Sequence, residues 1–445
     1  MIYEEAISYI RNIERSGSDY GIERMRILLD ALGAPDKKLK FVHVAGTNGK
    51  GSVCAYLTSV LKEAGYRVGT YNSPSVFSYN ERWSINGEVL DNDSVAKYMT
   101  VVRDRLRSLE NLDSYGKVKE QTHEVCEVCK PTAFEIETAV AMLAFSDNKC
   151  DIVVLETGLG GRWDATNAIT DKEVAVITPI GLDHCALLGN TLGEIAEEKS
   201  AIIKDTAVTC EQSDEIMQAI RHPYAIKDGK KIYYEADVKV CEAPILISVG
   251  REGQKFEYGG CGYEIGMLGA HQLQNASIAI CTVEALREKG WSISQSALIN
   301  GLKKARWNAR LEIAKNAEQR FNIHIPNGKT LVFDGAHNPH GARALADALK
   351  TYFKNDRIHL VMGILADKDV DGVIGILAPL ATRVTAVTPD SPRALKCEAL
   401  KDKVQKFASC DACGDIKQAV QNALDSDCDT VVLCGSLTLF HSLSD

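Results

Sequence analysis

The stretch 41-FVHVAGTNGKGSVCAYLTSVLKEAG-65 predicts a buried strand, a glycine turn and a helix. Such a turn leaves backbone amides unpaired and lets phosphate oxygens approach the main chain. The strict pattern G-x-x-x-x-G-K-[ST] is not met, because Gly51 separates Lys50 from Ser52 and Val44 stands at the first glycine position. We therefore expect a related phosphate loop, in which Lys50 neutralises phosphate charge and Ser52 offers its hydroxyl to Mg²⁺.

The rest of the chain repeats this alternation of short apolar runs and helical stretches. The first set of expected strands is 40-KFVHVAG, 67-RVGTYNSP, 151-DIVVLETG and 173-EVAVITPIG, and the second is 330-TLVFDGAHNP, 358-IHLVMGILADKD, 383-RVTAVTP and 429-DTVVLCGS. Alternation of this kind is typical of parallel βαβ units. The segment 231–268 instead alternates without helical period, which predicts a small antiparallel sheet.

These patterns predict an α/β protein of two domains, consistent with its 445 residues. Residues 1–303 are expected to form a P-loop-type parallel sheet with the small antiparallel subsheet. Residues 304–445 are expected to form a Rossmann-like α/β domain, with 304-KARWNARLE as the hinge. The polar segment 111–130 lacks periodicity and is expected to be a surface loop.

Composition excludes several classes of protein. A formal net charge of −9 without a long Lys/Arg block argues against a general nucleic-acid or anionic-membrane binder. Neither a membrane span nor a targeting peptide is visible, so we expect a cytoplasmic protein. Of 14 cysteines most stand singly in apolar segments. The pairs Cys126/Cys129 and Cys410/Cys413 lack a partner pair at zinc-finger spacing, which favours ordinary loop cysteines over a structural zinc.

Polar residues at expected strand ends mark candidate sites. Glu156 ends 151-DIVVLE beside the glycines of 157-TGLGG, which favours metal binding over a capping role. His184 follows the next strand, where a surface or core histidine is the more common explanation. Lys199 recurs with Leu192, Ile195 and Ile202 at spacings of three, four and three, so it is expected on an apolar stripe. A snorkelling lysine is the common explanation, but a buried lysine has a lowered pKa and a nucleophilic amine.

The second half offers a matching strand tip. Asp334 ends the expected strand 330-TLVFD, and His337 and Asn338 follow it directly. Because ligands of open α/β sheets collect at the carboxyl ends of strands, both domains are expected to face one shared cleft.

Ten motifs then occur along nearly the whole chain in the order of one known family: 43-HVAGTNGKGS, 73-SPSVFSYNERWSING, 155-LETGLGGRWDATN, 182-LDHCALLG, 194-EIAEEKSAIIK, 269-GAHQLQN, 307-WNARLE, 333-FDGAHNPHG, 363-GILADKD and 435-GSL. In these motifs the chain resembles folylpolyglutamate synthase, including its bifunctional bacterial form with dihydrofolate synthase activity, within the Mur-ligase superfamily. The resemblance implies an ATP-dependent ligase. It passes the γ-phosphate to a pteroate or folate carboxylate, and the amine of L-glutamate attacks the acyl phosphate.

The resemblance also implies residue roles. Catalytic roles fall to Lys50, His184 and Lys199, the last carbamylated by CO₂. Two Mg²⁺ ions would be held by Ser52, Ser73, Glu156, His184 and Lys199, and a monovalent cation is allowed. ATP would be bound by Gly46, Thr47, Asn48, Gly49, Lys50, Gly51, Ser52, Asn275, Arg310 and Asp334. The family is generally monomeric, with dihydropteroate or reduced folate, glutamate and ATP as its only implied partners.

The expected substrate-binding residues indicate which of the two activities the protein has. The resemblance implies substrate binding by Arg82, Arg162, Asp164, Ala165, His337 and Ser436. The segment 161-GRWDATN resembles members that accept dihydropteroate, so both activities are expected. The alternatives are polyglutamylation alone, another Mur-type amino-acid ligase, or a P-loop nucleotide switch. The chain departs from common family patterns at Ser75, Asn308 and Thr438, where many members have histidine, proline and tyrosine.

Overall fold

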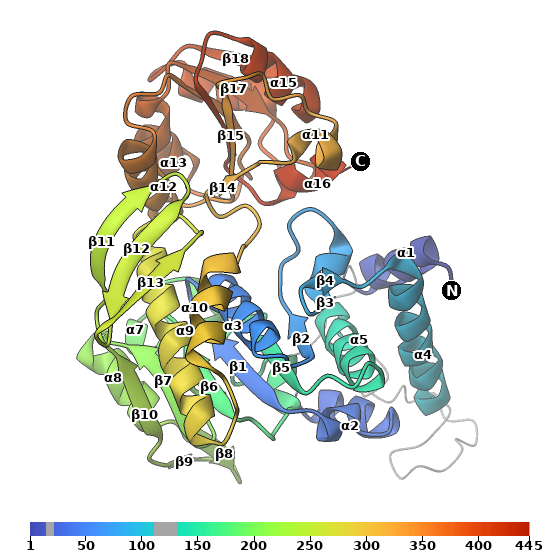
Figure 1. Cartoon of the computed structure of the whole chain (residues 1–445). Coiled ribbons are helices and arrows are strands. Elements are labelled where there is room, and N and C mark those ends of the chain that lie inside the picture. Colours follow the sequence, from blue (N-terminus) through green and yellow to red (C-terminus); the bar gives the residue numbers. More distant parts are fainter. Residues whose placement is uncertain (15–21, 111–130, 445) are drawn as a thin grey trace.

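The computed structural model describes residues 1–14, 22–110 and 131–444. Figure 1 shows two lobes, each built on its own β-sheet, with the second lobe lying above the first. The first lobe contains an eight-stranded sheet in the order β10-β7-β6-β1-β5-β2-β3-β4. The second contains a six-stranded sheet in the order β14-β15-β19-β16-β17-β18. The predicted two-domain α/β fold is confirmed.

The first sheet is parallel except at one edge. Its parallel strands are β1 (Phe41–Ala45), β2 (Val68–Tyr71), β5 (Ile152–Glu156), β6 (Val174–Ile177), β7 (Thr206–Cys210) and β10 (Asp237–Cys241). The short strands β3 (Trp83–Ile85) and β4 (Glu88–Val89) extend it in antiparallel fashion. All five residues of β1 are buried, as expected for a strand covered on both faces.

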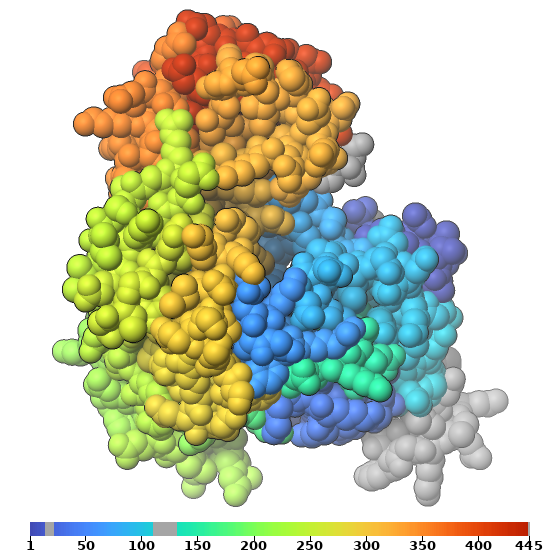
Figure 2. Space-filling view, in the orientation of Figure 1, coloured from blue at the N-terminus to red at the C-terminus, as the bar shows by residue number. Residues whose placement is uncertain are grey.

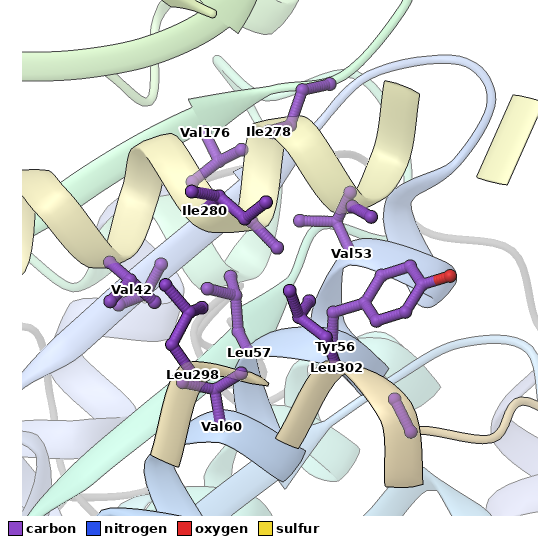
Figure 3. Packing of buried hydrophobic residues seen from close by; sticks show 14 of the residues in the cluster. Val42, Val53, Tyr56, Leu57, Val60, Val176, Ile278, Ile280, Leu298 and Leu302 are labelled. Atoms are coloured by element: carbon purple, nitrogen blue, oxygen red, sulfur yellow. The ribbon is translucent and has the colours of Figure 1, made fainter. Parts of the chain in front are cut away.

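Side chains of β1 alternate between two hydrophobic cores, one on each face of the sheet. Val42 and Val44 pack under α3 (Lys50–Glu63), α9 (His271–Glu288) and α10 (Gln295–Lys304). Figure 3 shows this core, with Val42 and Val176 from the sheet meeting side chains of the three helices. On the opposite face Phe41 packs with α1 (Tyr3–Glu14), α2 (Ile22–Ala31), α4 (Asn92–Glu110) and α5 (Ala133–Asp147). The helices α7 (Leu192–Ser200) and α8 (Asp214–Arg221) cover the β6–β10 end.

The predicted antiparallel sheet is smaller than expected. Only β11 (Ile245–Gly250), β12 (Gly253–Tyr258) and β13 (Cys261–Ile265) form it. Ahead of it, β8 (Tyr224–Lys227) and β9 (Lys230–Tyr233) pair as a separate hairpin. β10 joins the large sheet parallel to β7. The prediction for β10 was wrong because sequence alternation does not distinguish a parallel edge strand from an antiparallel one. β10 lies at the edge of the large sheet, and its burial increases from the exposed Asp237 to the buried Cys241.

The second lobe follows the same rules. β15 (Thr330–Asp334), β16 (Ile358–Met362), β17 (Arg383–Val387), β18 (Cys410–Cys413) and β19 (Thr430–Cys434) are parallel. The short β14 (Glu312–Ile313) adds an antiparallel edge. The helices are α11 (Ala317–Phe321), α12 (Pro339–Tyr352), α13 (Val370–Leu377), α14 (Cys397–Val404), α15 (Ile416–Asp425) and α16 (Thr438–Ser444).

A short linker joins the lobes between the end of α10 and the start of β14. Within it Ala309 and Leu311 both have φ near +50°, although neither is glycine. Left-handed conformations of this kind cost about 1 kcal/mol each. The linker is therefore held in its path by its contacts rather than by its own preference.

Two sequence-based expectations concern the surface and the cysteines. The segment 111–130 and the pair Cys126/Cys129 lie outside the described residues. Within the described part of the chain, no helix is long and apolar enough to cross a membrane. Cys410 and Cys413 lie on β18 as free thiols.

Candidate active site

The glycine turn between β1 and α3 is shaped by close approach. Gly46 has φ +145°, and a Cβ there would lie 1.9 Å from Thr178 Oγ1. Gly49, with φ +90°, precedes α3, and a Cβ there would lie 2.4 Å from Asn275 Oδ1. The first hydrogen bond of the helix runs from Val53 N to Gly49 O at 2.9 Å. The amides at the start of α3 therefore have no partner in the first turn of the helix, which is the geometry that can accept an anion.

Two lysines converge on this turn. Lys50 Nζ donates to Gly46 O at 3.2 Å, and Lys199 Nζ donates to the same carbonyl at 2.9 Å. Lys199 is 4% exposed at the end of α7. Burial, with a smaller contribution from Lys50, lowers the pKa of Lys199 to about 7. The predicted apolar setting of Lys199 is confirmed, because Ile195 and Ile202 are fully buried.

Glu156 ends β5 beside the turn and is also buried. Its Oε2 accepts hydrogen bonds from Asn72 Nδ2 at 2.8 Å and from Ser73 N at 3.3 Å. Burial raises the pKa of Glu156, and the positive charge of Lys50 opposes this effect. Among the described residues, the hydrogen-bond donors to Glu156 are uncharged, and a cation at this carboxylate would be stabilised.

His184 is placed differently from the other expected metal ligands. It is exposed at the start of the four-residue helix α6 (Cys185–Leu188), and its Nε2 lies 3.7 Å from Asp183 Oδ2. No described contact joins it to Glu156 or Lys199. The described residues contain no group of three or more His, Cys, Asp or Glu side chains that could hold a metal. Of the five residues expected to hold metal, only Glu156 and His184 are of these four types.

The oxygen donors near the turn nevertheless suit a hard divalent ion. Glu156 supplies a buried carboxylate, Ser73 bonds to it through its backbone, and Ser52 carries a buried hydroxyl at the start of α3. Mg²⁺ is usually held by one or two carboxylates, with water and substrate phosphates completing its octahedron. These residues fit such an ion.

Helix α9 supplies polar residues from far along the chain. Gln272 Nε2 donates to Ser52 Oγ at 3.1 Å, and Asn275 Nδ2 donates to Gln272 Oε1 at 3.1 Å. Gln272 is fully buried. The sequence analysis named Asn275 and missed Gln272, although their spacing of three places them on one face of a helix.

The linker also reaches the phosphate loop. Trp307 packs on Gly51, since a Cβ at Gly51 would lie 2.6 Å from the indole. Arg310 acts electrostatically on Glu156 of the first lobe and on Asp334 of the second. The carboxyl ends of the two sheets therefore face a common region, as predicted.

Asp334 ends β15 and organises the linker. Its Oδ2 accepts from Leu311 N at 2.8 Å and its Oδ1 accepts from Ala336 N at 2.9 Å. Burial raises the pKa of Asp334. Burial also lowers the pKa of His337, whose Nδ1 lies 2.8 Å from Gly335 O.

Asp183 and Ser436 lie near the carboxyl ends of strands, Asp183 in the first lobe and Ser436 in the second. Asp183 of the first lobe acts electrostatically on both Lys199 and His337. Ser436, just after β19, is buried, and its Oγ lies 2.8 Å from Thr438 Oγ1.

The expected substrate residues of the first lobe are held within the scaffold. Arg82 Nη1 pairs with Glu137 of α5 at 3.1 Å. Arg162 bonds to Glu198 at 2.9 Å, and its guanidinium lies 3.7 Å from the centroid of the Tyr224 ring.

Asp164 shapes the glycine loop after β5. Its Oδ2 accepts from Gly158 N and Leu159 N, each at 2.9 Å, and its Oδ1 accepts from Thr166 N at 3.0 Å. Burial raises the pKa of Asp164. Ala165 follows at the start of the short 3-10 helix η4 (Ala165–Ala168) and is 6% exposed.

Comparisons with known proteins agree with this geometry. Family models match residues 100–283 (Mur ligase middle domain) and 319–437 (Mur ligase, glutamate ligase domain). The chain is 37% identical over 412 residues to a dihydrofolate synthase/folylpolyglutamate synthase of Bacillus subtilis, covering 90% of this chain and 88% of that one.

Two solved structures carry ligands. E. coli FolC in complex with DHPP and ADP matches with a TM-score of 0.74 and 27% identity, covering 100% of this chain and 96% of that one. A bifunctional folylpolyglutamate synthase/dihydrofolate synthase from Yersinia pestis, complexed with AMPPNP and a Mn ion, matches with a TM-score of 0.76 and 26% identity, covering 100% and 97%.

Proposed function

We infer that this chain, which belongs to the dihydrofolate synthase/folylpolyglutamate synthase family of the Mur ligases, is an ATP-dependent ligase that joins L-glutamate to folates. One observation carries this inference. A phosphate loop with two lysines and a buried carboxylate faces, across Arg310, the strand tip that carries Asp334. A nucleotide switch has no use for this second tip. Solved relatives hold ADP, or AMPPNP with manganese, and ATP and a divalent metal are accordingly the nucleotide and ion of this enzyme.

The chemistry requires an anionic carboxylate to attack an anionic phosphate. Lys50 and the amides of the glycine turn draw charge from the γ-phosphate, which lowers the repulsion between the two anions. The γ-phosphoryl group then passes to the substrate carboxylate. The amine of glutamate attacks the acyl phosphate, forms the amide and releases phosphate.

We further propose that two Mg²⁺ ions are held by the five residues named from the family resemblance (Ser52, Ser73, Glu156, His184 and Lys199). When bound, these ions would neutralise phosphate charge and orient the transferring group. Glu156 and the two serines offer the oxygen donors that such ions prefer. His184 differs from the other four, because it is exposed beside Asp183. A monovalent cation remains compatible with the same family resemblance.

Lys199 fits this set only in a modified form, because a cationic lysine would repel a metal. Its pKa of about 7 leaves a large neutral fraction at physiological pH, and the neutral amine is the nucleophile that attacks the carbon of CO₂ and then loses a proton. The resulting carbamate would be an anionic ligand paired with the cation of Lys50. Catalytic roles are therefore proposed for Lys50, His184 and Lys199.

For the nucleotide we propose contacts from Asn275, Arg310 and Asp334, together with residues 46–52. For the nucleotide or the incoming glutamate we propose His337 and Ser436 on the second lobe. These residues come from both lobes, so closure would assemble the site and limit ATP hydrolysis by water.

For the pterin we propose a site lined by Arg82, Arg162, Asp164 and Ala165. Arg82, Arg162 and Asp164 already have partners within the first lobe. We propose that they act by shaping the loops that form the walls of the site. We propose both activities, on dihydropteroate and on reduced folates. Polyglutamylation alone is the alternative that a substrate panel distinguishes.

The proposed domain division is 1–303 and 304–445, just before α10 ends at Lys304. We also propose a monomer that acts in the cytoplasm on small-molecule substrates, without nucleic-acid or membrane partners. Size-exclusion chromatography with light scattering tests whether the protein is a monomer.

ADP release tests the function directly. With ATP and Mg²⁺, release should require both glutamate and a pterin acid, and each ADP should accompany one amide bond. The panel contains dihydropteroate, dihydrofolate, tetrahydrofolate and a UDP-muramyl peptide. ADP release that ignores glutamate, or that needs only the UDP-muramyl peptide, would overturn the proposal.

A further inference from the structure

The loop 72–82, which joins β2 to β3, contributes to the core of the second lobe. Figure 1 shows it extending from the first lobe to the second. Val76 and Phe77 near its tip are 4% and 6% exposed. They are buried in a hydrophobic cluster whose other members come from the linker and the second lobe, including Ala309, Phe321, Phe333, Val361, Leu433 and Phe440. The loop therefore crosses between the lobes.

Phe77 lies at the centre of an aromatic group. Its ring centroid is 4.9 Å from that of Phe321, 5.5 Å from Phe440 and 5.8 Å from Phe333. The last two contacts are edge-to-face, which is a preferred geometry for aromatic rings. The guanidinium of Arg320 covers the Phe77 ring at 4.5 Å from its centroid. Four second-lobe side chains thus hold one first-lobe ring.

A carboxylate holds the loop in shape and ties it to the linker. Glu81 Oε2 accepts from Val76 N at 2.7 Å and from Phe77 N at 3.0 Å. Glu81 Oε1 accepts from Asn308 Nδ2 at 3.0 Å. This bond needs the side-chain amide of Asn308 as its donor. The linker is therefore tied to the loop through this side chain.

The base of the loop is fixed on the first lobe at Glu156. Asn72 N donates to Arg82 O at 3.0 Å and closes the loop. Asn72 Nδ2 and Ser73 N both bond to Glu156. The loop 72–82 is thus hydrogen-bonded to Glu156 at its start and buried in the second lobe at its tip.

A cavity of about 380 Å³ lies beside this connection, where Figure 2 shows a recess between the two lobes. Pro74, Val76, Glu81 and Asn308 form part of its wall. This part of the loop therefore forms one wall of the cavity.

We propose that Phe77 is a positioning residue that docks the loop 72–82 into the second lobe and so couples the placement of that lobe to Asn72, Ser73 and Glu156. Loss of the docked ring would leave the second lobe free to sit at the wrong angle over the phosphate loop. The catalytic consequence rests on the proposed ligase function. Water would then reach the acyl phosphate and return the acid and inorganic phosphate without forming an amide.

The docking itself is tested without any activity measurement. Phe77→Ala, Phe440→Ala and the double variant are compared with wild type in urea unfolding of the full chain. A shared contact predicts that the double variant loses clearly less stability than the sum of the two single losses. Phe407→Ala is the matched control, because Phe407 is a 51% exposed phenylalanine of the second lobe outside the cluster. Strict additivity of Phe77→Ala and Phe440→Ala would overturn the docking.

The positioning role is tested by the number of ADP molecules released per amide bond. Wild type and Phe407→Ala should stay near one, and Phe77→Ala should rise several-fold. Its kcat should fall by about 10- to 100-fold, while the KM for ATP changes by less than about threefold. Phe77→Leu, which keeps apolar volume, should recover most of the coupling and replaces Phe77→Ala if that variant does not fold. An unchanged ratio in a variant whose docking is lost would overturn the positioning role, whereas a wild type that forms no amide would overturn the ligase proposal instead.

Discussion

Replacing Lys199 with methionine is expected to stabilise the fold while it abolishes ligation. Burial and the charge of Lys50 lower the pKa of Lys199 from 10.5 to about 7. Because the folded pKa lies below the unfolded one, the folded state disfavours the cation. The destabilisation caused by Lys199 has its full size below about pH 7 and disappears as pH rises toward 10.5. The difference of about 3.5 pKa units corresponds to roughly 5 kcal/mol at acidic pH and about 3 kcal/mol at pH 8.

Methionine keeps the apolar volume and removes the charge. It also removes the hydrogen bond to Gly46 O, which costs about 1 kcal/mol. The net gain in the free energy of unfolding should be about 4 kcal/mol at pH 6, about 2 kcal/mol at pH 8 and well under 1 kcal/mol at pH 9.5.

Urea unfolding at these three pH values, in buffer stripped of CO₂ and divalent ions, measures the trend. Lys62→Met is the control, since Lys62 is an exposed lysine in the last turn of α3. It should change stability by less than about 0.5 kcal/mol. A Lys199→Met variant that is less stable than wild type at pH 6, or whose gain does not shrink with rising pH, would refute the burial argument.

The same pair of proteins tests the carbamate. Bicarbonate with Mg²⁺ should raise the unfolding midpoint of wild type and leave that of Lys199→Met unchanged. Equal responses of the two proteins would contradict carbamylation.

Three further predictions concern the phosphate loop and its surroundings. Glu156→Gln should lower kcat by about 10²- to 10³-fold, and a normal kcat at saturating Mg²⁺ would exclude Glu156 as a metal ligand. Gly46→Ala should abolish nucleotide binding in calorimetry and lower the melting temperature, because the new Cβ would lie 1.9 Å from Thr178 Oγ1. Gly250→Ala, where nothing lies within 4 Å, should do neither. Asp164→Ala should reduce kcat/KM for dihydropteroate more than for tetrahydrofolate, and equal losses would contradict the pterin assignment.

Local patterns predicted much of this molecule. The strand, glycine turn and helix of the phosphate loop follow from apolar runs and helical period, because both features are written in neighbouring residues. The burial of Lys199 follows from its spacing to Ile195 and Ile202, although the helix α7 ends at Ser200.

Contacts between distant segments could not be read in this way. Gln272 reaches Ser52 across 220 positions, and no local pattern identifies that partner. His184 follows its strand as predicted, yet it is exposed beside Asp183, and no described contact joins it to Glu156. Membership of a motif therefore did not fix the position of a side chain relative to the others.

The sequence by itself determined the two α/β domains, the phosphate loop and the residue types at the strand tips. Only the tertiary structure decided that β10 pairs in parallel with β7 and that Phe77 is buried in the other lobe. The physical reason is that hydrophobic period shows which face of a segment is buried. The partner that covers that face is chosen by the packing of whole sheets and lobes.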